Sequence, residues 1–173
     1  TSPIISTKTK VDDAVWKLAM KYTINILEQH GNVVSQPQWD ELHRILGSFV
    51  YTVAYPEQKR RSAFPLPCGA GKTTTVRGYC KASYELGRSY KIVICAEKIE
   101  ALCELKRDLV NEDGIPNSLI SLLHSYDHDP DFNIENPKPG TASEPSDSDD
   151  LDDLKQIVLL SHSKLHQGYN KMP

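Results

Sequence analysis

Residues 65–75 read PLPCGAGKTTT, and the types and spacing of these residues suit the binding of a phosphate group. Gly69 and Gly71 can adopt backbone angles that other residues disfavour, which lets main-chain N–H groups approach a ligand closely. Several such groups at the start of a helix form an anion-binding site. Lys72 would add a positive charge for the β- and γ-phosphates, and Thr73 would offer a hydroxyl to the accompanying Mg²⁺.

The elements that must position this loop are a strand before it and a helix after it. The apolar run at residues 63–66 predicts the strand, and residues 72–86 are compatible with a helix that Gly87 ends. Residues 90–96 then predict a buried strand and residues 97–111 a helix. Two further strands are predicted over residues 118–125, whose length also allows a helix, and over residues 156–161. This order is typical of an α/β domain with a parallel sheet.

Residues 10–54 predict a small helical subdomain ahead of the loop. Apolar side chains recur there at helical spacing on both sides of Gly31, a predicted C-cap, and Ser35, a predicted N-cap. Both tryptophans of the chain, Trp16 and Trp39, fall on these apolar stripes, and we therefore expect both in the core.

Charge is distributed unevenly along the chain, whose formal net charge is −3. Residues 127–153 contain ten acidic residues and one lysine, against 13 acidic and 19 basic residues elsewhere. So polar a segment cannot bury enough apolar surface to offset its ordering entropy, which predicts a disordered acidic insert. The expected organisation is a flexible tail at 1–9, the helical subdomain at 10–54 and a nucleotide-binding domain at 55–173.

Several function classes receive no support from the composition. No run of about 18 apolar residues occurs, and the N-terminal segment lacks the apolar core of a signal peptide. The four cysteines have neither zinc-finger nor C-x-x-C spacing and are expected to be reduced thiols of an intracellular, cytoplasmic protein; they are Cys68, Cys80, Cys95 and Cys103.

The loop departs from the strict motif G-x-x-x-x-G-K-[ST], whose first glycine would fall on Leu66, and follows the variant G-x-G-K-T instead. In this form PLPCGAGKT resembles motif I of superfamily 1 and 2 helicases, commonly P-T-G-x-G-K-T, with Cys68 at the threonine. Residues 92–109 resemble motif Ia of these helicases, with Ala96, Lys98 and Leu102 in comparable places and Glu97 where the family has proline. Residues 157–165 resemble the family strand that ends in T-H-x-x-L, and the matching residues are Ser161, His162 and Leu165.

The resemblance covers residues 62–170 and implies part of a RecA-like P-loop domain that binds ATP and Mg²⁺. Lys72 and Thr73 would be its catalytic residues, with Thr73 also holding the Mg²⁺, and Gln58 would recognise adenine. The implied phosphate cradle consists of Cys68, Gly69, Ala70, Gly71, Lys72, Thr73 and Thr74. The implied nucleic-acid track consists of Lys98, Ser161, His162 and Lys164.

The same resemblance shows which family parts are missing. No D-E-x-x motif follows residues 157–165, and no second RecA-like domain supplies an arginine finger. We therefore expect the ATP-binding N-terminal portion of a helicase-like, nucleic-acid-dependent ATPase or translocase, without hydrolytic competence of its own. Its partners would be nucleotide, DNA or RNA, the rest of a larger polypeptide or a basic partner at the acidic insert, and no membrane.

Two other functional classes stay open. The chain could be another P-loop NTPase or a kinase without a nucleic-acid role, or a non-enzymatic adaptor whose loop has degenerated. His124, His128 and the three aspartates Asp127, Asp129 and Asp131 invite comparison with a calcium loop, but the central glycine and terminal glutamate of such loops are missing. Arg60 and Arg61, just ahead of the loop, could contact nucleotide or nucleic acid, or lie in solvent.

Overall fold

The computed structural model describes residues 11–124, 147 and 154–168 of the chain. The chain divides into two compact units, Thr1–Leu86 and Gly87–Pro173. The glycine loop and the helix after it therefore belong with the helices of the first unit, whereas the sequence suggested a boundary between residues 54 and 55.

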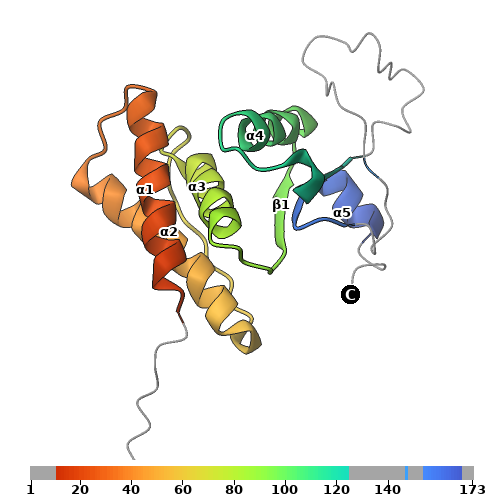
Figure 1. Ribbon diagram of the computed structural model, residues 1–173, viewed down its shortest axis with the longest axis horizontal. Helices are drawn as coiled ribbons and strands as arrows, with labels where there is room; N and C mark the ends of the chain where they lie inside the picture. The colour runs from red at the N-terminus through yellow and green to blue at the C-terminus, as the bar shows by residue number, and fades with distance from the viewer. Residues whose placement is uncertain (1–10, 125–146, 148–153, 169–173) are drawn as a thin grey trace, which may run out of the picture. The chain divides into compact units, whose positions relative to one another are not determined.

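Three helices build the first unit: α1 (Asp13–Gln29), α2 (Gln36–Ala54) and α3 (Lys72–Glu85), with a 3₁₀ turn, η1 (Pro56–Gln58), after α2 (Figure 1). All three were predicted. The Asp12 side chain caps α1 by accepting from the Val15 N–H, and Ser35 caps α2 as predicted, by accepting from the Gln38 N–H at 3.4 Å.

A glycine lets α1 and α3 approach closely. A Cβ atom added to Gly78 of α3 would lie 2.4 Å from the Thr23 hydroxyl oxygen and 2.7 Å from the Ala19 carbonyl oxygen of α1. Thr23 is buried there and donates its own hydroxyl to the Ala19 carbonyl. Apolar side chains of α1 and α2 complete the core of this unit, among them Val15, Ala19, Leu27, Leu42, Leu46 and Val50.

The strand predicted over residues 63–66 does not form, and residues 59–67 have no regular secondary structure. Pro65 is the physical reason, because proline has no N–H to donate to a sheet ladder. The chain instead makes a tight turn around this proline, in which the Leu66 N–H donates to the Phe64 carbonyl oxygen at 2.9 Å.

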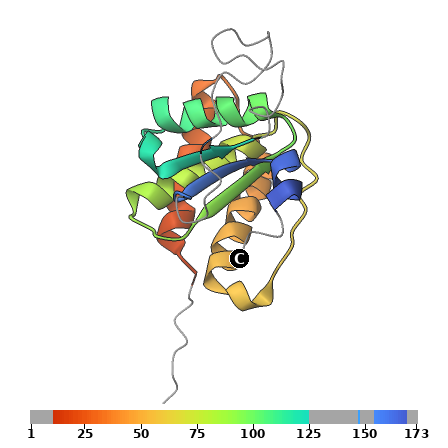
Figure 2. The same cartoon turned by 90° about the vertical axis from the view of Figure 1, so that its right-hand side faces the viewer.

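A three-stranded parallel sheet forms the second unit, which confirms the predicted α/β class with a parallel sheet. Its strands are β1 (Ile92–Ala96), β2 (Ile120–Leu123) and β3 (Ile157–Ser161), and Figure 2 shows β3 in the middle. Every residue of β2 and β3 is buried, as expected of strands covered on both faces. The prediction of a buried strand was wrong for β1, in which exposed and half-buried residues alternate and Val93 is 54% exposed, because one face of this edge strand is less covered than the other.

Helix α4 (Ile99–Asn111) packs against this sheet with the apolar stripe that its spacing predicted. Ile99, Leu102, Leu105 and Leu109 of this stripe are all buried. A 3₁₀ turn, η2 (Asn117–Leu119), occupies the first part of the strand predicted at 118–125, and α5 (His162–Gly168) follows β3 directly.

The backbone of β2 also forms two hydrogen bonds with Asp147. The Leu122 N–H donates to the Asp147 carboxylate at 2.8 Å, and the Asp147 N–H donates to the Leu122 carbonyl oxygen at 2.7 Å. Asp147 is the one described residue of the predicted acidic insert, whose remaining residues, with those of the predicted tail, lie outside the described residues.

The two tryptophans differ from the expectation of a core position. Trp16 is half-buried, and Trp39 is 37% exposed, so the prediction was wrong for Trp39. The reason lies in a neighbouring ring: Trp39 covers the imidazole of His43 instead of entering the core. All four cysteines carry free thiols, with Cys80 and Cys103 buried and Cys68 and Cys95 exposed.

Candidate phosphate-binding loop

The glycine loop is a tight, exposed turn between the irregular segment and α3. Gly69 and Gly71 both adopt positive φ angles, +80° and +101°, that side chains with a Cβ rarely adopt. The Ala70 N–H closes the turn on the Pro67 carbonyl oxygen at 3.3 Å. Gly71 is also confined by space, because an added Cβ would lie 3.3 Å from Leu27 of α1.

The start of α3 leaves backbone donors unused within the helix. Its first intrahelical bond runs from the Thr75 N–H to the Gly71 carbonyl oxygen at 2.9 Å, so the N–H groups of Lys72, Thr73 and Thr74 have no carbonyl acceptor within the helix. No side chain caps this end, because the N-cap residue is Gly71. The positive end of the helix dipole and its donors are therefore directed out of the loop.

The side chain of Lys72 bonds back to the residue that begins the loop. Its side-chain ammonium donates a hydrogen bond to the Leu66 carbonyl oxygen at 2.7 Å, six residues back along the chain, and the side chain is exposed. The positive charge therefore lies at the carbonyl that precedes the turn formed by residues 67–71.

The three threonines that follow have different environments. Thr73 is exposed and Thr74 is half-buried. The Thr75 hydroxyl is buried, within 2.8 Å of the Gly71 carbonyl oxygen and 2.7 Å of the Lys72 carbonyl oxygen, where it donates inside its own helix. Thr73 is therefore the threonine whose hydroxyl can reach a ligand in solvent, as the motif predicts.

A residue that the sequence did not single out anchors the loop to α2. The side-chain amide of Gln38 donates to the Ala70 carbonyl oxygen at 3.1 Å. Gln36, two residues earlier, bonds Asp40 of its own helix instead, at 2.8 Å. Nothing in the local sequence distinguishes the two glutamines; only the tertiary packing of α2 beside the loop does.

Lys72 also lines a cavity of about 330 Å³ within the first unit. Its walls come from α2, from the irregular segment and from α3, and they include Phe49, Thr52, Arg60, Ser62, Phe64 and Val76. Gln58, the residue that the resemblance assigns to adenine, is exposed in η1 and does not line this cavity. The exposed Cys68 and the half-buried Ala70 belong to the turn itself.

The residues of the implied nucleic-acid track lie in the second unit, at one edge of the sheet. Ala96 of β1 pairs with Ser161 of β3, so the residues that follow these two strands leave the same carboxyl edge. Lys98, at the N-cap of α4, and His162 are exposed there, and Lys164 is half-buried.

Two of the polar residues at this carboxyl edge are buried. Ser161 is 1% exposed, and its hydroxyl accepts the Lys164 N–H at 3.2 Å, which caps α5. His124, next after β2, is likewise 1% exposed. Among the described residues no group of three His, Cys, Asp or Glu side chains is placed to hold a metal ion, and residues 127–131 of the calcium alternative lie outside them.

Comparison with known proteins adds no assignment to this geometry: no family model, no curated protein and no solved structure matches the chain. Within the described part of the chain, none of the helices is both long and apolar enough to cross a membrane.

Proposed function

We propose that the loop of residues 66–74 binds the triphosphate of ATP together with Mg²⁺. The observation that carries the proposal is the start of α3: an uncapped helix end, preceded by two glycines at positive φ, with the Lys72 ammonium above it. Backbone donors and a fixed cation around one exposed turn form an environment that favours a phosphate anion.

Different residues of the loop would contact different parts of the Mg-ATP complex. Lys72 would leave the Leu66 carbonyl and bond the β- and γ-phosphate oxygens, exchanging a neutral acceptor for a charged one. The first-turn N–H groups of α3 would wrap the same oxygens. The exposed hydroxyl of Thr73 would ligate Mg²⁺, which supplies further positive charge to the phosphates.

Rapid hydrolysis is not part of the proposal. Phosphoryl transfer needs a positioned water and carboxylates that hold the metal. The described residues that line the cavity beside Lys72 include neither Asp nor Glu. We therefore assign nucleotide binding to this chain and expect turnover to require a carboxylate from another segment or another polypeptide.

The wider proposal is a helicase-like, nucleic-acid-dependent ATPase of RecA-like type, acting inside the cell. It is supported by the resemblance of the glycine loop to motif I and by the polar residues at the carboxyl edge of the parallel sheet. Lys98, His162 and Lys164 would contact the phosphates of a DNA or RNA strand, a contact that positions the strand without reading its sequence.

The decisive experiment is a calorimetric titration of the chain with Mg-ATP, comparing the original protein with Lys72→Ala. We expect at least about a tenfold loss of affinity, since hydrogen bonds to charged groups contribute about 1.5–3 kcal/mol. Lys91→Ala is the matched control, because the Lys91 ammonium also donates to a backbone carbonyl, that of Leu154 at 2.9 Å, but belongs to the other unit. Equal ATP affinity in all three proteins would end the phosphate proposal.

A second titration separates the functional classes. A helicase-like protein binds single-stranded nucleic acid with an affinity that falls as salt rises. A kinase would bind ATP but no nucleic acid even at low salt, and an adaptor with a degenerate loop would not bind ATP.

A further inference from the structure

An aromatic cavity of about 530 Å³ lies in the first unit, between α1, α2 and the segment before the glycine loop. Four of the residues that line it have aromatic rings: Trp16, His43, Tyr51 and Phe64. No part of the proposed phosphate grip uses these rings.

Stacking fixes part of this wall. The imidazole of His43 lies between two indoles, with ring centroids 4.5 Å from Trp16 and 4.9 Å from Trp39 and interplanar angles of 21° and 11°. The indole N–H of Trp16 also donates to the His43 carbonyl oxygen at 3.0 Å. Tyr51 meets the Trp16 ring edge-on, at a centroid distance of 6.3 Å. A flat ligand would therefore meet aromatic surface that is already oriented.

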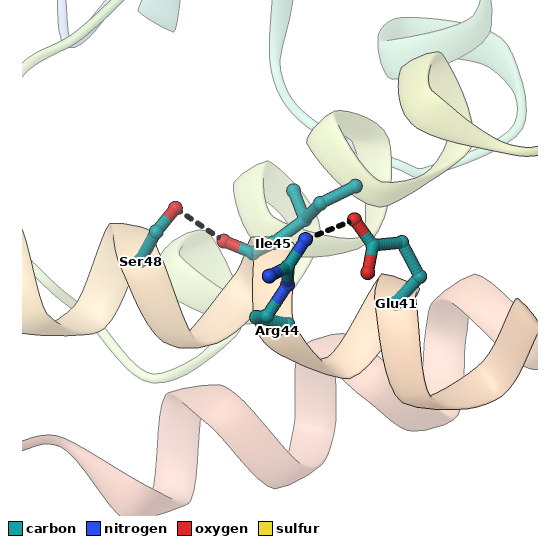
Figure 3. Close-up of polar contacts among 4 residues, drawn as sticks. All are labelled: Glu41, Arg44, Ile45 and Ser48. Carbon is teal, nitrogen blue, oxygen red and sulfur yellow. Dashed lines mark hydrogen bonds and ion pairs between the residues drawn. The ribbon is translucent and has the colours of Figure 1, made fainter. Parts of the chain in front are cut away.

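The charged groups in the cavity wall are both positive. The Arg44 guanidinium lies 5.5 Å from the centre of the Phe64 ring, and that of Arg60 lies 5.9 Å from the centre of the Tyr51 ring. Arg44 forms an ion pair with Glu41 at 2.6 Å (Figure 3). Glu41 is outside the wall, and the described wall residues include no Asp or Glu. The cavity thus suits a molecule that combines a flat ring with negative charge.

Two of the hydroxyls in the wall are committed to the helix, and the other two, those of Tyr51 and Ser62, can donate or accept and so do not distinguish adenine from guanine. Ser48 donates to the Ile45 carbonyl oxygen at 2.7 Å, as Figure 3 shows, and Thr52 donates to the Ser48 carbonyl oxygen at 2.7 Å. Among the described wall residues there is no side-chain amide that could pair with a base edge. Ring stacking and arginine contacts are therefore the main means by which this wall can hold a base.

The aromatic cavity and the cavity beside Lys72 share walls. Five residues line both, namely Ser48, Thr52, Arg60, Ser62 and Phe64. The two cavities therefore adjoin, and a ligand that extends past these residues would have its anionic end at Lys72 and its flat end among the rings. A nucleoside triphosphate has this arrangement of charge and ring.

We propose that the aromatic cavity holds the base and ribose of the nucleotide whose phosphates the glycine loop grips, and that it accepts adenine and guanine alike. This inference rests on the proposed function, because it places the two ends of one ligand. The base stacks on the rings of Trp16, Tyr51 or Phe64, because the His43 imidazole already lies between two indoles, and Arg60, which lines both cavities, contacts the ribose. Recognition of the base edge plays no part, so the pocket selects a purine nucleotide by shape and charge.

The test measures the affinity of the full chain for ATP, GTP and inorganic triphosphate, each with Mg²⁺. We expect ATP and GTP to bind within about threefold of one another, and triphosphate to bind about tenfold or more weakly, since base–aromatic stacking contributes roughly this much per base. Phe64→Leu and Arg60→Ala should weaken ATP binding about fivefold or more while the affinity for triphosphate stays the same. Arg61→Ala is the matched control, because this neighbouring arginine is exposed and lines neither cavity.

Other results would contradict particular parts of the proposal. Triphosphate binding as tightly as ATP would remove the base pocket and leave the phosphate loop standing. A preference of more than about tenfold for one purine would overturn base tolerance, because stacking tolerates any base. Loss of triphosphate binding in Lys72→Ala alone supports the loop, whereas unchanged binding of every ligand in that variant would remove the proposed function and the base pocket with it.

Discussion

The side-chain ammonium of Lys72 donates a hydrogen bond to the main-chain carbonyl oxygen of Leu66 at 2.7 Å. This bond joins the two ends of the glycine loop at its surface. A lysine in this position holds its charge at the loop before any ligand arrives, and on binding it would exchange the Leu66 carbonyl for a phosphate oxygen.

The first prediction concerns stability without ligand. Lys72→Ala should change the free energy of unfolding by less than about 1 kcal/mol, because an exposed hydrogen bond is readily replaced by water. Urea denaturation in the absence of nucleotide measures this. A loss of more than about 2 kcal/mol would mean that Lys72 holds the fold together, and a fall in ATP affinity of the variant could not then be attributed to the phosphates.

The second prediction concerns the anchor of the loop. Gln38→Ala removes the hydrogen bond to the Ala70 carbonyl and should lower ATP affinity several-fold, because the loop must then be ordered by the ligand. Gln36→Ala removes a similar side-chain bond, to Asp40, on the same helix and should leave ATP affinity unchanged. Equal losses in the two variants would show a general effect of α2 in place of a local one.

The third prediction concerns the crossing of α1 and α3. An exposed Gly→Ala change inside a helix normally stabilises by about 0.5–1 kcal/mol, but Gly78→Ala should destabilise by about 1–3 kcal/mol through overpacking. The added methyl would meet the Thr23 hydroxyl at 2.4 Å and the Ala19 carbonyl at 2.7 Å. Thermal denaturation shows directly whether Gly78→Ala raises or lowers the stability of the protein.

A double variant tests the mechanism of this loss. The double variant Thr23→Ala/Gly78→Ala should lose less unfolding free energy than the sum of the losses in the two single variants, because Thr23→Ala removes one of the two clashing atoms. Simple additivity would mean that the Thr23 hydroxyl is not the obstacle.

The fourth prediction concerns pH. The Tyr22 hydroxyl donates a hydrogen bond to the Glu85 carboxylate, and this bond, with burial and the charge of Glu85, raises the pKa of Tyr22 from 10.0 to about 12. The neutral phenol is therefore favoured by the fold, and its contribution to stability is complete below pH 10. Between about pH 10 and pH 12 the unfolded chain ionises first, and the contribution is lost.

Denaturation of the original protein and of Tyr22→Phe across this range measures the effect. The stability difference between the two proteins should be constant up to pH 10 and then shift against the original protein as the pH approaches 12. A difference that stays constant throughout would show that Tyr22 titrates alike in the folded and unfolded chains.

The fifth prediction concerns the carboxyl edge of the sheet. If Lys98 and Lys164 each contact one nucleic-acid phosphate, the double variant to alanine should reduce the slope of log affinity against log salt by about 1.4, at about 0.7 per contact for single strands. Binding of a fluorescent oligonucleotide at several salt concentrations measures the slope. Lys21→Ala, an exposed lysine of α1, serves as control, and an unchanged slope in the double variant would place the contacts elsewhere.

Local pattern predicted the elements of this chain well. The helical spacing of apolar residues located α1, α2, α3 and α4, and the bounded β-branched and apolar runs located β1 and β3, each to within a few residues. The cap at Ser35 followed from residue type alone. These features depend on neighbours within one or two turns, which a sequence displays directly.

Long-range relations were harder to predict. The apolar run at 63–66 has the hydrophobicity of a strand, but Pro65 removes a backbone donor that a strand needs. The bond from Gln38 to Ala70 joins residues 32 positions apart, and the rings of the aromatic cavity come from α1, α2 and the segment before the loop. No periodicity marks such groupings, so only the folded chain reveals them.

The order of the sheet has a consequence for biosynthesis. β1 and β2 do not pair with one another, and both pair with β3, which follows them along the chain. Their shared hydrogen bonds must therefore wait until residues 157–161 have emerged from the ribosome, whereas the helices within residues 13–85 can pack as soon as they are made. A nascent chain halted before β3 would carry two apolar strands without their sheet partner, and such unpaired strand edges favour aggregation.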